Sequence, residues 1–293
     1  MKNMNYVLFV DSDCDVSLKE AQEKGVGFIS MPYMIDDKEI YPYKDWEEFD
    51  YHAFYEMLRK GTLPKTSGIS PAAYMELFEP AFKEGKDILY VHFSAAMSGT
   101  FNALELALEE LKEKYPERCF ARVDSKGISA LGYCVFEEVY RLYSEGKSLD
   151  EILKWAETEV DHFACYFYAD DLKFFGKSGR VSGFSSFMGN LIGIRPLITV
   201  NEEGKMVSCD KAVGRNTAVK KVLGYVEQLQ DEIAKYPVYI AHSDCLHLAE
   251  KAAEELKKHY GEDLNIHYCV VNPTIGSHCG PDCVGVCFHA KKR

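Results

Sequence analysis

The chain has 293 residues, of which 47% are hydrophobic, 13% aromatic and 27% charged. This composition is that of a globular protein and excludes disordered, collagen-like and coiled-coil chains. With 34 Lys and Arg against 46 Asp and Glu, the net charge is −12. Nucleic acids and anionic lipid surfaces are bound by basic surfaces, so we expect no nucleic-acid partner and at most transient membrane contact.

The start of the chain shows no targeting signal. Its first apolar run, residues 6–10, is too short for the core of a signal peptide. No apolar run approaches the ~20 residues that a membrane helix needs. Without a secretion signal, the ten cysteines are expected to be reduced thiols, so we expect a cytoplasmic protein.

Strands alternate with helices over the first 160 residues, which is typical of βαβ units and a mostly parallel sheet. The expected strands are 6–10, 26–35, 88–93 and 119–123, and the expected helices are 49–58, 71–83, 100–114, 129–144 and 148–160. Asp36 and Asp37 indicate a tight turn that leads into a hairpin strand at 39–41. Ser70 fits a helix N-cap and Pro71 the first helical position.

The pattern changes after about residue 160. Expected elements are a strand at 162–168, a Gly- and Ser-rich loop at 174–183, a hairpin of 194–200 with 205–210, a helix at 216–235, a strand at 238–241, a helix at 246–260, a strand at 264–271, a loop at 272–281 and a strand at 284–289. This order favours an α+β layer with an antiparallel sheet.

The sequence therefore predicts an α/β protein of two domains. Residues 1–160 form an N-terminal domain with a mostly parallel sheet, flanking helices and a small hairpin and helix excursion near 33–65. Residues 161–293 form a C-terminal α+β domain, and a ligand is expected between the two.

Several catalytic motifs are absent from the sequence, among them GxSxG, GxGxxG and the phosphate-binding loop GxxxxGK[ST]. Two other patterns each have a structural explanation. His278, Cys279, Cys283, Cys287 and His289 fall within twelve residues, but their spacing fits thiols packed in a core about as well as zinc ligands. We expect no metal and no cofactor.

Asp11 and Asp13 follow the first strand two residues apart, as in the first motif of haloacid-dehalogenase-type phosphatases. There one carboxylate attacks phosphorus while Mg²⁺ neutralises charge. Asp15, however, stands where that family has Thr or Val, and no lysine is well placed for its third motif. A Mg²⁺-dependent phosphatase that uses Asp11 and Asp13 is the alternative function.

Three segments favour an anionic ligand. Residues 65–71 and 93–100 place hydroxyls and backbone N–H groups before helices, where the helix dipole favours an anion. Residues 275–281 enclose His278 between glycines. In an open α/β sheet, ligands collect at the loops that follow the strands.

These segments belong to a longer series in which the chain resembles the DegV family of bacterial fatty-acid-binding proteins. The matching pieces, in order, are Asp11-Ser12-Asp13-Cys14-Asp15, Thr66-Ser67, Ser70-Pro71, Ser94, Ser98-Gly99-Thr100, Asp124-Ser125, Leu131-Gly132, Asp171-Leu172, Ser178-Gly179-Arg180-Val181-Ser182, Ile194-Arg195-Pro196-Leu197, Gly204-Lys205, Gly214-Arg215 and His278-Cys279-Gly280-Pro281.

The resemblance implies a carrier without catalytic residues that holds one long-chain fatty acid in a tunnel between two domains. It implies that Thr66, Ser98 and His278 bind the carboxylate. It further implies a partner, a separate ATP-dependent fatty acid kinase that converts the presented carboxylate into an acyl phosphate.

Other matches imply weaker roles. A head-group or partner-docking role is implied for Ser94, Gly99, Thr100, Arg180 and Arg215. Helical spacing beside the Ser-Gly-Arg loop makes Phe184, Phe187, Met188, Leu191 and Ile192 candidates for lining the acyl chain, although an ordinary core face explains them equally well.

The chain also departs from the family pattern. Ala95, Met97, Lys177, Val213 and Asp282 replace the residues usual at those positions, and they put kinase docking and chain-length preference in question.

Overall fold

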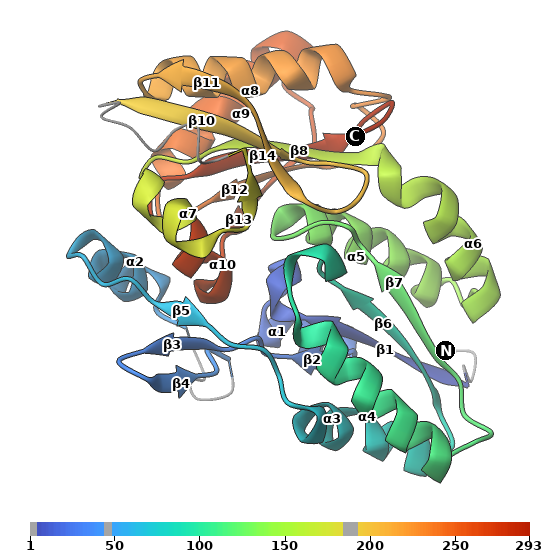
Figure 1. Ribbon diagram of the computed structural model, residues 1–293. Helices are drawn as coiled ribbons and strands as arrows, with labels where there is room; N and C mark the ends of the chain where they lie inside the picture. Colours follow the sequence, from blue (N-terminus) through green and yellow to red (C-terminus); the bar gives the residue numbers. More distant parts are fainter. Residues whose placement is uncertain (1–4, 44–48, 184–192) are drawn as a thin grey trace.

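The computed structural model describes residues 5–43, 49–183 and 193–293. Figure 1 shows its elements in layers. Two helices cover the outer face of one large sheet, a central helix separates this sheet from a second one, and two more helices cover the far side of the second sheet. The chain has the mixed α/β fold that its sequence predicts.

The first half of the chain forms a parallel sheet of four strands in the order β2-β1-β6-β7. The strands are β1 (Tyr6–Asp11), β2 (Gly27–Ile29), β6 (Asp87–His92) and β7 (Phe120–Asp124). β1 and β6 are apolar and buried almost throughout, as expected for parallel strands with both faces covered.

The helices of this half connect and cover the strands. They are η1 (Ser12–Cys14), α1 (Leu18–Lys24), α3 (Pro71–Lys83), η2 (Ala95–Met97), α4 (Thr100–Lys114), α5 (Ala130–Ser144), α6 (Leu149–Glu159) and η3 (Val160–His162). Ser70 caps α3 by accepting the N–H of Ala73, with Pro71 as the first helical residue, which confirms the start predicted for this helix.

A small antiparallel sheet in the order β4-β3-β5 projects from this half together with one helix. Its elements are β3 (Tyr33–Ile35), β4 (Lys38–Ile40), α2 (Tyr51–Arg59) and β5 (Lys65–Thr66). Asp36 and Asp37 have φ values of 48° and 61°, the left-handed backbone of a two-residue hairpin turn, so the predicted turn is confirmed.

The second half forms a sheet of seven strands in the order β13-β12-β14-β8-β10-β11-β9. The strands are β8 (Phe163–Tyr168), β9 (Val181–Ser182), β10 (Ile194–Val200), β11 (Met206–Val213), β12 (Val238–His242), β13 (Ile266–Val270) and β14 (Val284–His289). The predicted antiparallel sheet is wrong in part, because β12 pairs with β13, and β11 with β9, in parallel. The helix α9 (Leu246–Tyr260) provides the crossover from β12 to β13.

Other predicted boundaries differ from the structure for local reasons. The strand expected at 26–35 divides into β2 and β3 around Pro32, which has no N–H to donate. The loops expected at 174–183 and 272–281 contain short helices, α7 (Leu172–Ser178) and α10 (Pro273–Cys279). Seven residues are too few for helical periodicity to appear in a sequence.

One long helix is shorter than expected. α8 (Arg215–Leu229) ends before residue 235 because Gln230 leaves the helical conformation and forms an isolated bridge with Ala290.

The two halves pack against each other through α5, which contacts β1 and β6 on one side and β8, β12 and β14 on the other. α8 and α9 cover the opposite face of the seven-stranded sheet (Figure 1). At the end of the chain, the Arg293 guanidinium donates to the carbonyls of Ser125, Lys126, Val160 and Phe163. These bonds fix the C-terminus where the two halves join.

None of the helices within residues 5–43, 49–183 and 193–293 is long and apolar enough to cross a membrane.

Candidate functional site

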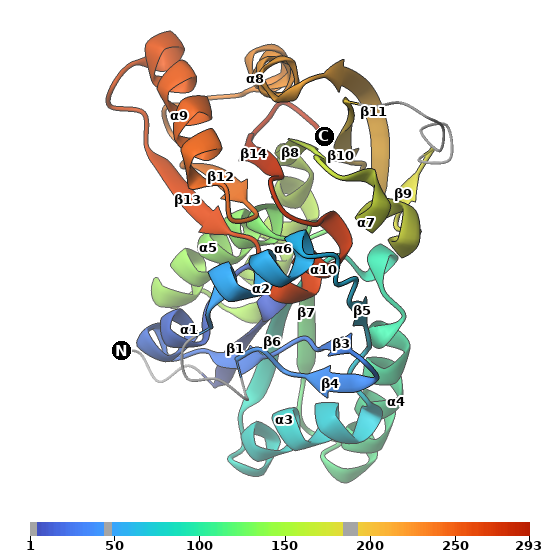
Figure 2. The same ribbon diagram turned by 90° about the vertical axis from the view of Figure 1, so that its left-hand side faces the viewer.

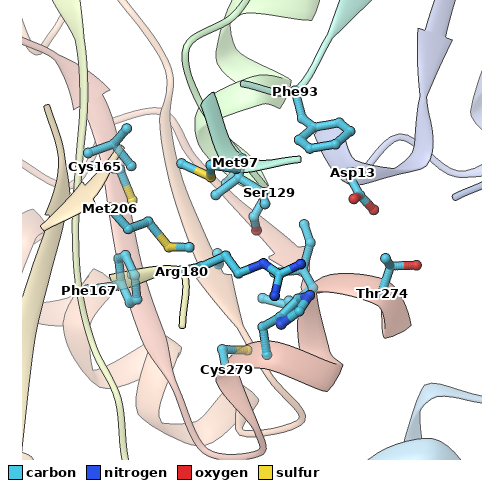
Figure 3. Close-up of a pocket in the computed structure, with 18 of the residues that line it drawn as sticks. Asp13, Phe93, Met97, Ser129, Cys165, Phe167, Arg180, Met206, Thr274 and Cys279 are labelled. Atoms are coloured by element: carbon cyan, nitrogen blue, oxygen red, sulfur yellow. The ribbon is translucent and has the colours of Figure 1, made fainter. Parts of the chain in front are cut away.

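A cavity lies between the parallel sheet and the seven-stranded sheet. Figure 3 shows Asp13 and Thr274 on one side, Cys165, Phe167 and Met206 on the other, and Arg180 reaching between them. Most of the wall is apolar. Its apolar side chains include Met31, Phe93, Met97, Ile128, Phe167, Phe175, Val200, Met206, Val271, Ile275 and Val284.

Three polar residues that the sequence singled out meet at this cavity, although they are far apart in the chain. Thr66, Ser98 and His278 all line it. The Oγ1 of Thr66 and the Nε2 of His278 are 2.9 Å apart, a hydrogen-bond distance. All three side chains are partly buried, so a ligand group bound by them would be largely shielded from water.

Local structure places each of the three. Thr66 ends β5, where it pairs with Tyr33 of β3. Ser98 stands between η2 and α4, and its Oγ accepts the N–H of Thr100 at 3.2 Å, which leaves its own O–H proton available to a ligand. His278 lies in α10, which packs against β5 and α2 (Figure 2).

The imidazole of His278 is uncharged at neutral pH. Burial, followed by the nearby charge of Arg180, lowers its pKa to about 4. A neutral imidazole has one donor and one acceptor nitrogen, so either His278 or Thr66 donates the hydrogen bond between them. An anion that replaced this hydrogen bond could accept hydrogen bonds from Thr66 and His278 instead. Because the imidazole is neutral, the anion would be bound by uncharged donors.

Arg180 lies at the entrance. It lines the cavity and also an adjacent polar hollow, of which Met97 and Ser98 form part of the wall. The other residues of the hollow are Ala95, Ala96, Gly99, Ser178, Gly179, Ser182 and Lys205. Two exposed cations, Arg180 and Lys205, therefore face this mouth, even though the chain is acidic as a whole.

The other residues with an implied head-group role are placed differently. Ser94 is buried and its Oγ donates to the carbonyl of Gly204 at 2.7 Å, so this hydroxyl joins the two halves. Gly99 lines the mouth. Thr100 lines the cavity, but its Oγ1 already accepts the N–H of Ile69 at 3.0 Å and lies 3.1 Å from the hydroxyl of Tyr74.

Arg215 belongs to an ion-pair network instead of the cavity wall. Its guanidinium donates to Asp170 and to Asp282, and Asp282 also accepts from Arg59 at 2.8 Å. Asp282 has a φ of 63°, a conformation that glycine adopts more easily. By pairing with both Arg59 and Arg215, Asp282 links α2 to α8.

The five candidates for acyl-chain lining, Phe184, Phe187, Met188, Leu191 and Ile192, lie outside the described residues. The apolar wall that the structure does describe comes mainly from buried strands. The sequence analysis missed this wall, and small residues on alternate positions of β14 were its only signal.

On β14, Cys287 contributes to the wall, as do Cys283 just before the strand and Gly285. Val286 and Phe288 point away, into the core under α8 and α9. Val284, at the start of the strand, belongs both to this core and to the cavity wall. A Cβ on Gly285 would lie 2.8 Å from the Cβ of Phe167, so glycine is needed where β14 passes β8.

The aspartates after β1 are buried and differ in their contacts. Asp11 does not line the cavity in the described part of the chain, and its carboxylate accepts hydrogen bonds from Tyr90, Phe93 and Asp13. Burial raises its pKa to about 7. A carboxylate bound in this way cannot reach a phosphate ester, so the geometry does not support the phosphatase alternative.

The thiols near the end of the chain give no sign of a metal centre. Within the part of the chain that is described, no three His, Cys, Asp or Glu side chains are arranged to hold a metal ion. All ten cysteines are free, and Cys279, Cys283 and Cys287 are buried in the cavity wall.

Comparisons with known proteins agree with this geometry. A family model described as "Uncharacterised protein, DegV family COG1307" matches residues 5–291. A DegV domain-containing protein of Clostridium perfringens is 33% identical over 284 residues, which cover 97% of both chains.

Solved structures show the same fold. The fatty acid binding DegV family protein of Streptococcus agalactiae is 25% identical, with a TM-score of 0.82 over 99% of this chain and 100% of that one. A DegV family protein of Eubacterium eligens, loaded with heptadecanoic acid, is 21% identical, with a TM-score of 0.81 over 98% of this chain and 100% of that one.

Proposed function

Because the chain belongs to the DegV family, we propose that it binds one long-chain fatty acid in the cavity between its two halves. Thr66, Ser98 and His278 hold the carboxylate. The observation that carries this proposal is the convergence of these three residues on one largely apolar cavity, with Thr66 and His278 in hydrogen-bond contact.

The three side chains offer what a carboxylate requires. A buried anion without donors is strongly destabilised, whereas hydrogen bonds to a charged group contribute about 1.5–3 kcal/mol each. The hydroxyls of Thr66 and Ser98 and one nitrogen of His278 supply such donors, and the guanidinium of Arg180 at the entrance adds positive charge.

The acyl chain supplies most of the affinity. Each buried methylene contributes about 0.8 kcal/mol, so a chain of ~16 carbons gains about 10 kcal/mol or more before ordering costs are subtracted. The wall formed by β8, β14 and the residues around them provides the apolar surface for this burial.

The carrier then presents the carboxylate to a separate ATP-dependent fatty acid kinase in the cytoplasm, where acyl phosphate forms. The polar mouth supports this step. It joins the cavity through Ser98 and Arg180, and Lys205 adds a second cation, so an anionic phosphate donor meets positive charge near the carboxylate. The chain itself needs no phosphate-binding loop for this function.

Replacing Ser98 by Ala tests the carboxylate site. The variant loses one hydrogen bond to a charged group, so we expect its Kd for oleate to rise by about 10- to 100-fold. Titration calorimetry measures the change.

Ser70→Ala is the matched control, because Ser70 caps α3 and does not line the cavity in the described structure. Equal affinities of the wild type and Ser98→Ala would remove Ser98 from the site.

A further inference from the structure

One carboxyl group in the cavity wall has no place in the fatty-acid site described above. Asp13, in the turn η1 after β1, is only 5% exposed and lines the cavity. Its Oδ1 is buried without a hydrogen-bond partner among the described residues. Buried polar atoms are rarely left unpaired, and each exception calls for an explanation.

Most donors near Asp13 bind the neighbouring acids, and Asn272 is shared between Asp15 and Asp13, which leaves Oδ1 of Asp13 unpaired. Tyr90 and the backbone of Phe93 donate to Asp11. On the other side, the carboxylate of Asp15 accepts from Ser129 and, at 3.0 and 3.1 Å, from the backbone and side chain of Asn272.

The other hydroxyls of the wall nearby are also occupied. Thr274, which lies on the same side of the cavity as Asp13 (Figure 3), donates to the carbonyl of Met31 at 2.8 Å. The hydroxyl proton of Ser129 goes to Asp15. Among the described residues no hydroxyl donor is left for Oδ1 of Asp13, so a ligand in the cavity is positioned to supply its partner.

Asp13 is held between two other carboxyl groups. Burial, followed by the charges of Asp11 and Asp15, raises the pKa of Asp13 well above its usual range, against a hydrogen bond from Asn272 that lowers it. The surroundings thus favour the neutral acid over the carboxylate. A neutral carboxyl has one O–H donor and further acceptor capacity. Such a group pairs best with a neutral group that both donates and accepts.

We propose that Asp13 recognises a hydroxyl group on the acyl chain, so that the ligands preferred by this cavity are hydroxylated long-chain fatty acids. This inference rests on the proposed function and names the class of fatty acid. A plain alkyl chain packed against Asp13 leaves Oδ1 unpaired, which costs binding free energy. A hydroxyl on the acyl carbon nearest Asp13 can accept a hydrogen bond from the protonated carboxyl group and donate its own O–H to the other carboxyl oxygen.

The described residues around Asp13 do not favour a metal cation as the missing partner. Within the described residues, no three acidic, His or Cys side chains are arranged around a common point. The remaining wall of the cavity is mostly apolar, with Met31, Phe93 and Val271 among its members. An alkyl chain with one hydroxyl fits such a wall, whereas an ion would lack ligands.

The test compares stearic acid with a series of hydroxystearic acids whose hydroxyl moves along the chain from carbon 3 to carbon 18. Titration calorimetry with the wild-type protein gives the Kd of each. We expect one position, or two adjacent ones, to bind about tenfold more tightly than stearic acid.

Two variants connect that preference to Asp13. Asp13→Leu fills the position with an apolar side chain, and it should remove the preference while stearic acid still binds. Asp13→Asn keeps a donor and an acceptor, and it should retain most of the preference. Circular dichroism and thermal unfolding show that each variant is folded before its affinities are compared.

The outcomes separate the two proposals. If stearic acid binds and no hydroxylated acid binds more tightly, the role of Asp13 is wrong and the fatty-acid carrier stands. A preference that survives in Asp13→Leu also overturns it. If neither stearic acid nor any member of the series binds, the proposed function itself fails.

Discussion

At the scale of single residues, Thr66 and His278 are hydrogen-bonded to each other in the structure. The two side chains come from β5 and α10, and they satisfy each other at 2.9 Å. In the binding mode proposed above, a fatty acid carboxylate accepts from both side chains and replaces this bond. Binding would then exchange one internal bond for bonds to a charged group, which are the stronger kind.

The pH dependence of stability gives a residue-scale prediction for Asp13. Its raised pKa means that the folded protein binds a proton that the unfolded chain releases above about pH 4. The stability that Asp13 contributes is present below that pH and is lost as the pH rises. Relative to the wild type, Asp13→Asn should therefore gain up to about 1.4 kcal/mol per pH unit above pH 4.

Urea unfolding of both proteins at pH 4.5, 5.5, 6.5 and 7.5 measures this difference. Groups that titrate alike in both proteins, such as His278, cancel in the comparison. Asp37→Asn is the control, because Asp37 lies in an exposed hairpin turn whose left-handed backbone Asn also tolerates. A stability difference between Asp13→Asn and the wild type that does not change with pH would contradict the prediction.

The sequence indicated some residues of the site and could not indicate others. Thr66, Ser98 and His278 stand in recognisable motifs. The unpaired Oδ1 of Asp13 has no sequence signal, because it depends on which donors the fold gives to Asp11 and Asp15. Those donors come from Tyr90, Phe93, Ser129 and Asn272, far away along the chain.

At the scale of elements, two short helices carry much of the site. α10 begins at Asn272, which accepts the N–H groups of Thr274 and Ile275, and it presents His278 to β5. α7 ends at Gly179 with a φ of 66°, and this turn directs the chain toward Arg180 and β9. Hydrophobic periodicity predicted the long helices well but not these two. α10 packs against β3, β5 and α2, and α7 packs against α10, so tertiary contacts place both.

The rim of the mouth gives the element-scale prediction. Lys205, in the turn between β10 and β11, lines the hollow outside the cavity but not the cavity itself in the described structure. Lys205→Glu reverses a charge on the rim where the proposed kinase would dock, and it also breaks the pair of Lys205 with Glu203. We expect fatty acid affinity to change by less than about twofold, because a rim charge chiefly affects association with charged partners.

Acyl-phosphate formation is then measured with the ATP-dependent fatty acid kinase of a bacterium that has a protein of this family. With Lys205→Glu we expect the rate to fall by about tenfold at low ionic strength. Lys251→Glu, on the exposed surface of α9, has the same charge change away from the mouth and should react like the wild type. Equal rates for all three proteins would contradict docking at this rim.

At the scale of the whole molecule, the two halves of the chain meet around the cavity. Thr66 and Ser98 come from the first half and His278 from the second, and the sequence predicted this division. The exact boundary near residue 160 stays a prediction, since α5 and Arg293 join the halves closely. The parallel pairing of the first sheet was readable from the alternation of strands and helices, whereas its strand order was not predicted. The mixed sheet was not, because β9 and β13 are placed by long-range pairing.

The net charge of −12 concerns the surface of the whole molecule. It argues against nucleic acids and anionic membranes as partners, but it does not exclude an anionic ligand that is held inside. Arg180 and Lys205 both lie at one opening. Lys205 is paired there with Glu203 at 2.7 Å, and Arg215 is paired elsewhere with Asp170.

The central claim is that the cavity holds a long-chain fatty acid. Mass spectrometry of the lipid extracted from purified, denatured protein tests it most directly. We expect close to one long-chain fatty acid per chain or, if purification removes it, a rise in melting temperature when palmitate or oleate is added back. No bound lipid together with an unchanged melting temperature would contradict it.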